Sequence, residues 1–120
     1  MADTRNILIA GVGGQGAILA SNILSLAALE AGFDAKKSEI HGMSQRGGSV
    51  FSHIRFGSRV HSPVIPRGAV HVFLSLELME SLRWLDHLNP ATRLVISSTR
   101  ILPAMAESYP EGIEAALRKT

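Results

Sequence analysis

A glycine-rich turn is the first stretch of this sequence whose residue types suggest binding chemistry. The run Gly-Val-Gly-Gly-Gln-Gly at 11–16 follows the apolar run 7–10 and precedes a long helical pattern, which predicts a strand that turns sharply into a helix. The order Gly-X-Gly-X-X-Gly matches the dinucleotide-binding fingerprint, in which bare backbone N–H groups meet a pyrophosphate at a helix N-terminus. Gln15 carries the only side chain of the turn able to hydrogen-bond a ligand directly. The glycines of the turn are Gly11, Gly13, Gly14 and Gly16.

The glycine turn alone leaves two interpretations open. The turn could bind a phosphate or another anion, or its glycines could serve only close packing between the strand and the helix. The dinucleotide fingerprint also requires an acidic residue about 20 residues further on, where it holds the ribose. Glu30, Asp34 and Glu39 straddle that spacing, but none clearly ends a predicted strand. A role in NAD or FAD binding therefore stays the weaker alternative.

The second stretch is the polar loop Ser-Glu-Ile-His-Gly-Met-Ser-Gln-Arg-Gly-Gly-Ser-Val at 38–50. A loop with three glycines loses much backbone entropy on ordering, so we expect a ligand or partner to organise it. His41 and Glu39 could act as a base and its orienting group, and Arg46 could clamp a carboxylate or phosphate. Each residue also has a plain interpretation, His41 as a solvent-facing loop histidine and Arg46 as a structural ion-pair partner.

Composition bounds the remaining possibilities. The 120 residues are 46% hydrophobic and 18% charged, which predicts one globular domain over residues 1–120. The net charge is +2, and the sequence has no run of basic residues that would suggest binding to nucleic acid. The absence of cysteine excludes disulfides and cysteine-ligated clusters from this chain. The short polar N-terminus and the glycine-broken apolar runs predict a cytoplasmic protein without a membrane segment.

The hydrophobic pattern predicts an α/β fold. The expected strands comprise residues 7–10, 33–40, 49–56, 60–64, 70–76 and 93–98, and the expected helices comprise residues 17–31, 77–87 and 111–119. The apolar runs at 7–10, 70–76 and 93–98 predict buried strands. The first helix is expected to be buried and to end at Gly32. The scattered His53, His61, His71 and His87 have no metal-ligand spacing and are treated as structural.

We therefore predict a Rossmann-like, three-layer α/β domain with a mostly parallel sheet. The first two strands and the helix between them should form a right-handed βαβ crossover. Residues 49–56 and 60–64 should form an inserted β-hairpin around the turn at 57–59. A final helix without a following strand suggests a domain that lacks its C-terminal third.

The two motifs together carry a resemblance to a known family. The segments at 11–16 and 38–50, with His-Ile-Arg-Phe-Gly at 53–57, resemble the gamma domain of the 2-oxoacid:ferredoxin oxidoreductases. The run His-Gly-Met-Ser-Gln-Arg-Gly-Gly is the most specific part, and it favours the beta subunits of the indolepyruvate type. The resemblance covers the order and spacing of these segments, and Ser97-Ser98-Thr99 with Pro103 resembles a later strand and turn of the family.

The resemblance implies an enzyme that acts only as a complex. Such a complex oxidatively decarboxylates aryl-2-oxoacids to acyl-CoA and reduces ferredoxin. Thiamine diphosphate, Mg²⁺ and the [4Fe–4S] clusters are expected in a partner alpha subunit, with coenzyme A as co-substrate and no cofactor held by this chain alone. This chain would position substrate, coenzyme A and the partner. The implied substrate, coenzyme A or interface residues, none of them assigned as catalytic or metal-binding, are Gly11, Gly13, Gly14, Gln15, Gly16, Glu39, His41, Ser44, Gln45, Arg46, Gly47 and Gly48.

Two other classes of protein compete with this interpretation. A free-standing Rossmann protein that binds NAD(P) or FAD would use the same glycine turn. An adenylating protein of the ubiquitin-activating type has a similar Gly-X-Gly-Gly-X-Gly loop. That third class predicts a catalytic or zinc-binding cysteine pattern downstream, and the sequence contains no cysteine.

Overall fold

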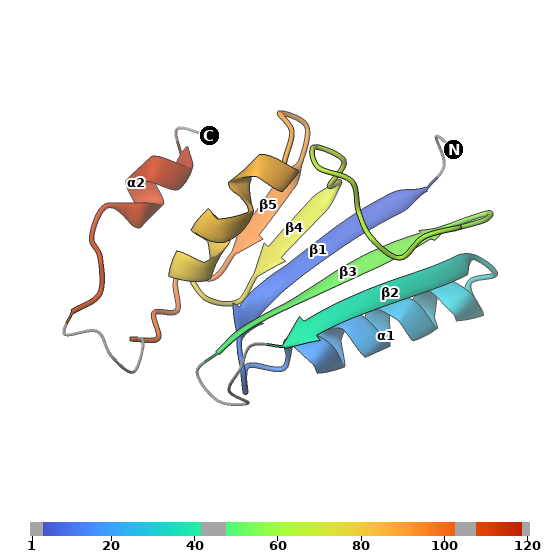
Figure 1. The fold of residues 1–120 in the computed structure, drawn as a ribbon, viewed down its shortest axis with the longest axis horizontal. Coiled ribbons are helices and arrows are strands. Elements are labelled where there is room, and N and C mark those ends of the chain that lie inside the picture. Colours follow the sequence, from blue (N-terminus) through green and yellow to red (C-terminus); the bar gives the residue numbers. More distant parts are fainter. Residues whose placement is uncertain (1–3, 42–47, 103–107, 119–120) are drawn as a thin grey trace.

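A computed structural model describes residues 4–41, 48–102 and 108–118 of the chain. Its elements are β1 (Arg5–Val12), α1 (Ala17–Glu30), β2 (Asp34–His41), β3 (Ser49–Gly57), β4 (Val72–Ser75), the 3₁₀ helix η1 (Met79–His87), β5 (Arg93–Ile96) and α2 (Ile113–Arg118). The strands form one five-stranded sheet in the order β2-β3-β1-β4-β5. In Figure 1, η1 lies in front of the sheet and α1 lies behind it, which gives three layers.

Strand directions confirm the expected mostly parallel sheet. β4 is parallel to both β1 and β5, whereas β3 is antiparallel to both β1 and β2. It follows that β1, β2, β4 and β5 run in one direction and that β3 alone runs in the other. The connection β1-α1-β2 is therefore a parallel crossover, but β3 lies between its two strands. The expected crossover from the first strand over the helix to the second strand is thus present, with β3 inserted between the two strands.

The predicted hairpin between residues 49–56 and 60–64 was wrong, because β3 forms its hairpin with β2. The register pairs Asp34 with Gly57 at one end and His41 with Val50 at the other. Pro63 removes a backbone donor that a strand at 60–64 would need. β2 contains no proline, so all of its residues can take part in the ladder with β3.

Side chains of the sheet hold the segment that follows β3. The Nη1 of Arg55 donates to the carbonyl oxygens of Ser62 and Val64 at 3.1 and 3.4 Å. The backbone N–H of Val60 donates to Oδ2 of Asp34 at 2.8 Å. These bonds satisfy backbone groups that a strand ladder would otherwise satisfy, so the segment is ordered without being a strand.

Two apolar clusters fill the spaces on either side of the sheet. Leu8 and Phe73 are fully buried on the η1 side, where Trp84 and Leu88 pack against their cluster. Ile9 and Ile54 are fully buried on the other side, under α1. The alternation of Leu8 and Ile9 between the two cores follows from the two-residue period of a strand covered on both faces.

The first helix is only partly buried, contrary to the expectation. The buried residues of α1 are the small Ala17, Ser21, Ser25 and Ala28, and the partly buried Ile18 and Leu24 pack against the same core. Other large apolar side chains of α1 are exposed, and Leu26 is 61% exposed. The helix ends as predicted at Gly32, whose φ of 95° and whose hydrogen bond to Leu29 O form a Schellman-type end.

The C-terminal half is less buried and less regular than expected. The strand at 70–76 is confirmed as β4, with narrower bounds, and the helix at 77–87 is a 3₁₀ helix. The strand at 93–98 is β5, and its Leu94 and Val95 are 39% and 55% exposed. β5 is an edge strand, so its side chains have a neighbouring strand on one side only. In the described part of the chain, no helix is long and apolar enough to cross a bilayer.

A buried histidine joins β3 to the segment after it. The Nδ1 of His53 accepts the backbone N–H of Ile65 at 3.0 Å, so its imidazole must be neutral to keep this bond. The ring is packed edge-on against the rings of Trp84 and His87. Burial first, and then the neighbouring His87, lowers the pKa of His53 below its ordinary value.

We predict that protonation of the unfolded chain at His53 lowers stability in mild acid. Since the folded-state pKa is depressed, the stabilisation is complete above the unfolded pKa of about 6.5 and is lost as the pH falls below it. Urea unfolding between pH 7.5 and 5 should therefore show a falling free energy of unfolding, and His53→Gln should reduce its slope with pH. An equal slope in both proteins would contradict the assignment.

Candidate functional site

The glycine turn connects the C-terminal end of β1 to α1 through left-handed backbone. Gly14 and Gly16 have φ values of 97° and 91°, which L side chains adopt only with strain. Gly11 is required for another reason, because a Cβ there would lie 3.1 Å from Oε1 of Gln15 and 3.3 Å from Cβ of Leu76. The turn therefore needs Gly14 and Gly16 for its conformation and Gly11 for close packing.

Gln15 fastens the turn to the sheet. Its Oε1 accepts the backbone N–H of Val12 at 2.8 Å, and its Nε2 donates to the carbonyl oxygen of Leu76 at 2.7 Å. Val12 ends β1, and Leu76 follows β4 directly, so the amide bridges the carboxyl ends of two neighbouring parallel strands. The chain leaves β1 and β4 toward opposite faces of the sheet, so this place is the topological switch point. In open α/β sheets, ligands bind at the switch point.

The second motif reaches the same end of the sheet. Pairing of β1 with β3 places Val12 opposite Ser49, and the backbone N–H of Gly13 donates to the carbonyl oxygen of Gly48 at 2.8 Å. The glycine turn and the end of the polar loop are thus in direct contact. The predicted site residues Ser44, Gln45, Arg46 and Gly47 lie outside the described residues.

Glu39 is held on the face of β2 that α1 covers. Its Oε2 accepts from Nζ of Lys37 at 2.8 Å and from Oγ of Ser21 at 2.6 Å. The same Lys37 Nζ also donates to Oδ1 of Asn22 on α1. This network joins β2 to α1. His41, the expected partner of Glu39 as a base, ends β2 opposite Val50, and its side chain lies outside the described part.

The inserted strand moves the end of β2 away from the glycine turn. With β3 between β1 and β2, any acid at the end of β2 is two strand spacings from β1, roughly 10 Å. In the dinucleotide fingerprint the ribose-binding acid lies on the strand next to the glycine turn. Glu39 is further away and already bound by Lys37, whereas Glu30 and Asp34 lie at the opposite end of β2.

One buried acid near the switch point was missed by the sequence reasoning. Glu77 follows β4 and is 1% exposed. Its Oε1 accepts the backbone N–H of Glu80 at 2.8 Å, and its Oε2 accepts that of Ile101 at 2.9 Å and the hydroxyl of Tyr109. The carboxylate therefore joins the ends of β4 and β5 to the segment before α2. An acid directly after a buried strand was the only signal in the sequence.

Tyr109 is a tyrosine whose hydroxyl is less acidic than that of a free tyrosine. Burial first, and then the hydrogen bond to the Glu77 carboxylate, raises the pKa of Tyr109 to about 12. Its hydroxyl oxygen also accepts the backbone N–H of Met79 at 2.6 Å, at the start of η1. The hydroxyl thus connects Glu77, after β4, with the start of η1, and it is protonated at neutral pH.

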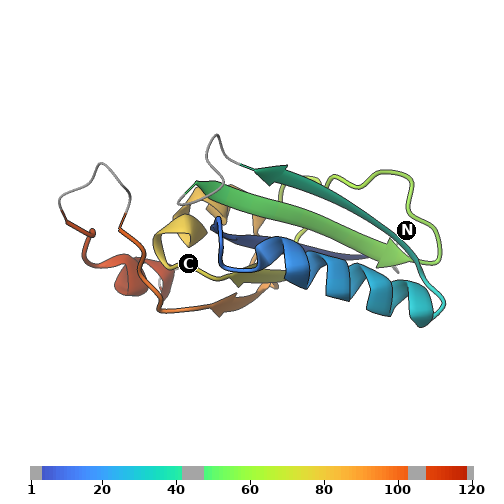
Figure 2. The same cartoon turned by 90° about the horizontal axis from the view of Figure 1, so that it is seen from below.

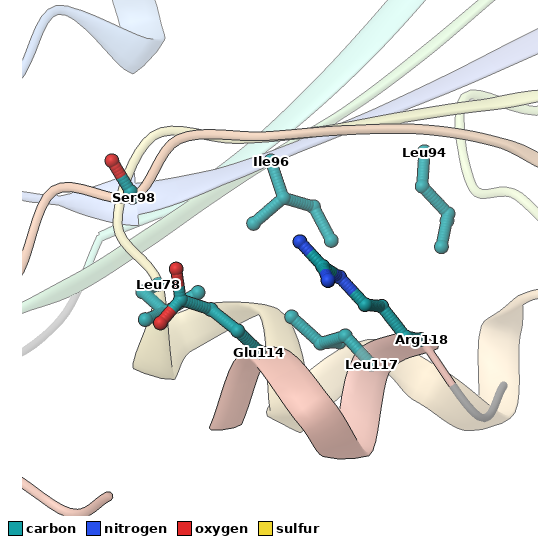
Figure 3. Close-up of a pocket in the computed structure, with 7 residues that line it drawn as sticks. All are labelled: Leu78, Leu94, Ile96, Ser98, Glu114, Leu117 and Arg118. Atoms are coloured by element: carbon teal, nitrogen blue, oxygen red, sulfur yellow. The ribbon is translucent and has the colours of Figure 1, made fainter. Parts of the chain in front are cut away.

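A groove of about 460 Å³ lies between β5 and α2. Its apolar lining includes Leu94 and Ile96, and Figure 3 shows the guanidinium of Arg118 reaching toward Ile96. Glu114 lies at the other end of the groove and accepts from Nη2 of Arg100 at 2.6 Å. Among the described residues, no three histidine or acidic side chains are grouped so that they could hold a metal ion.

Comparison with known proteins places this geometry in a family. The model of the family described as pyruvate ferredoxin/flavodoxin oxidoreductase matches residues 6–119. A protein of Archaeoglobus fulgidus named indolepyruvate oxidoreductase subunit IorB is 44% identical over 110 residues, which are 88% of this chain and 54% of that protein. The protein of the same name from Pyrococcus horikoshii is 45% identical over 103 residues, 86% of this chain and 50% of that protein. The chain thus spans about half the length of these curated relatives.

Solved structures share the fold. The gamma subunit of a keto/oxoacid ferredoxin oxidoreductase from Geobacter sulfurreducens is 27% identical with a TM-score of 0.62, over 78% of this chain and 51% of that one. A 2-oxoglutarate:ferredoxin oxidoreductase from Magnetococcus marinus is 20% identical with a TM-score of 0.70, over 92% of this chain and 19% of that one. The second likeness concerns the fold alone.

We predict that Gln15→Leu destabilises the fold, because it leaves the N–H of Val12 and the carbonyl of Leu76 without their partner. Loss of a partner for buried polar groups typically lowers the free energy of unfolding by about 1–3 kcal/mol. Urea unfolding of the variant beside the wild type measures the loss. A change below about 0.5 kcal/mol would show that Gln15 does not fasten the turn.

We also predict that Tyr109 ionises well above the ordinary tyrosine pKa of about 10. It is the only tyrosine of the chain, so an ultraviolet absorbance titration reports it alone and should show a midpoint near 12 in the folded protein. Since the folded-state pKa is raised, the stabilisation is complete below about pH 10 and is lost as the pH rises through the folded-state value. Glu77→Gln should lower the midpoint, and an unchanged midpoint would contradict the contact.

Proposed function

The chain belongs to the pyruvate ferredoxin/flavodoxin oxidoreductase family, and on this premise we propose that it is part of a subunit of a ferredoxin-dependent 2-oxoacid oxidoreductase of the indolepyruvate type. The proposal rests first on relatives named indolepyruvate oxidoreductase subunit IorB that are 41–45% identical over most of this chain. The reaction would convert an aryl-2-oxoacid and coenzyme A to acyl-CoA and carbon dioxide, with two electrons passed to ferredoxin.

One contact in the structure supports a positioning role for this chain. The hydrogen bond from Gly13 to Gly48 joins the glycine turn to the polar loop, so both motifs of the family resemblance lie at one end of the sheet. The turn supplies backbone of fixed conformation, and the loop carries the polar side chains. Of these, Arg46 has the planar guanidinium best suited to hold a carboxylate or phosphate by two directed bonds. We propose this end as the surface toward substrate, coenzyme A or the partner subunit.

The cofactors are assigned to a partner alpha subunit. Ferredoxin reduction in such a complex requires iron–sulfur clusters, and these are held by cysteine thiolates that this chain does not contain. We place thiamine diphosphate and Mg²⁺ in the same partner. Thiamine diphosphate, when bound there, supplies the carbanion chemistry of decarboxylation. The share of this chain is to bind, to orient and to exclude water, in a complex that we place in the cytoplasm.

The geometry gives less support to a free-standing dinucleotide-binding protein. At the switch point, where a dinucleotide would bind, Gln15 already bridges β1 and β4. The acid at the end of β2 is displaced from the glycine turn by the inserted β3 and is bound to Lys37 and Ser21. Neither observation favours a pyrophosphate and a ribose at this place.

We predict that the chain is inactive alone and active in a complex. Co-expression with a thiamine-dependent alpha subunit of the indolepyruvate type should yield a stable complex that reduces ferredoxin when given indolepyruvate and coenzyme A. The isolated chain should show no such reduction, because it lacks the residues for the redox centres. The rate of ferredoxin reduction measures both.

Two results would contradict this proposal. Activity of the isolated chain would remove the need for a partner. Saturable micromolar binding of NADH or NADPH to the purified chain would instead support the dinucleotide-binding alternative, and fluorescence titration measures it directly. The matched control for the complex is the alpha subunit expressed alone, whose activity should rise when this chain is added.

A further inference from the structure

The outer edge of β2 is open along a strand of eight residues. β2 is an edge of the sheet, and among the described residues no strand pairs with its outer side (Figure 1). An open edge of this length presents backbone donors and acceptors to a further strand, and proteins normally block or use such an edge. The sequence of β2, Asp-Ala-Lys-Lys-Ser-Glu-Ile-His, carries charges of both signs.

The space beside this edge is concave and largely apolar. A groove of about 370 Å³ runs between α1 and β2, and Leu26 and Leu29 of α1 line it although they are 61% and 50% exposed. Ser25, which is 8% exposed, also lines the groove, and its Oγ has no hydrogen-bond partner among the described residues. Figure 2 shows α1 running along the sheet on this side, so a strand added to β2 would lie next to the groove. The groove leaves Leu26 and Leu29 uncovered beside the β2 edge.

The charges of β2 select one way in which two copies of the strand can pair. Two identical strands pair antiparallel around a two-fold axis normal to the sheet, and side chains of directly opposite residues then share a face. A register centred on Ser38 places Lys37 opposite Glu39 of the second copy, and Glu39 opposite Lys37 of the second copy. Both side chains lie on the face toward α1, as their contacts with Ser21 and Asn22 show.

The neighbouring registers are unfavourable. Centring the pair on Lys36, Lys37 or Glu39 sets two like charges directly opposite each other at the axis. The register centred on Ser38 also pairs nearly the whole strand, from residue 35 to residue 41. It sets Lys36 opposite Ile40 of the second copy, and Ile40 is 51% exposed in the single chain. The aliphatic stem of a lysine can cover such a side chain.

We propose that the β2 edge is a self-association surface, on which two copies of this chain join their sheets antiparallel around Ser38. The partner is a second copy because the edge is complementary in charge to itself in this register. Backbone hydrogen bonds would give the pairing its direction, and the α1 flanks would bring Leu26 and Leu29 together over the grooves. Apolar area of this kind is needed because a single pair of strands buries less than a stable interface requires.

A cysteine cross-link tests the register directly. The natural chain has no cysteine, so Ser38→Cys introduces a single thiol. In the proposed dimer the two Cα atoms at position 38 would be about 4.5–5.5 Å apart, within the range that a disulfide spans. The matched control is Lys36→Cys on the same strand, whose two copies would be separated by more than about 13 Å.

We expect Ser38→Cys to form a covalent dimer under mild oxidation at micromolar concentration, and Lys36→Cys to remain largely monomeric on denaturing gels. Equal cross-linking of both variants would indicate random collision and would overturn the proposal. A Ser38→Cys protein that keeps its fold by circular dichroism but does not cross-link would overturn it as well.

Reversal of the charges provides a second test. Lys37→Glu places like charges opposite each other and should weaken dimerisation by roughly tenfold or more, whereas Lys37→Glu combined with Glu39→Lys should restore it. Sedimentation equilibrium of the wild type, the single variant and the double variant measures the dissociation constants. A wild-type chain that sediments as a monomer at all concentrations tested, or a double variant as weak as the single one, would refute the assigned register.

Discussion

The central strand β1 is hydrogen-bonded on both of its edges, and the rest of the structure depends on this double pairing. It runs antiparallel to β3 along its whole length and parallel to β4 on the other side. Antiparallel pairing with β3 brings Gly48 to the glycine turn, and parallel pairing with β4 brings Leu76 to Gln15. The two neighbours of β1 thus bring Gly48, at the end of the polar loop, and Leu76 to the glycine turn.

The inserted strand explains why a dinucleotide fingerprint and its usual ligand need not go together. The glycines allow the left-handed turn and the close approach of Gln15 and Leu76, which are requirements of the fold itself. Ligand binding would require, in addition, an open switch point and an acid on the adjacent strand. Here Gln15 spans the switch point, and β3 occupies the adjacent place. The glycines of the turn are thus explained by backbone conformation and by packing, without a bound dinucleotide.

The burial of charge differs between the two halves of the molecule. Glu39 is paired with Lys37 between β2 and α1, so that region is joined by a charged network. Glu77 is buried more deeply and is held by backbone N–H groups and by Tyr109 rather than by a cation. A carboxylate can be buried in this way when several donors replace its water. It fixes the ends of β4 and β5, and through Tyr109 it fixes the segment that leads to α2.

The sequence by itself determined the local elements and the family. The glycine turn, the helix from Ala17 to its end at Gly32 and the strand β4 follow from apolar spacing and from glycine conformations, which are properties of neighbouring residues. Only the tertiary structure decided which strands are neighbours. Whether residues 49–57 pair with residues 60–64 or with β2 depends on a competition between distant backbone groups, which Pro63, Arg55 and Asp34 settle in favour of β2. The exposure of α1 and β5, and the contacts of Gln15, Glu39 and Glu77, were likewise decided by that arrangement, because burial depends on what the rest of the chain places opposite each side chain.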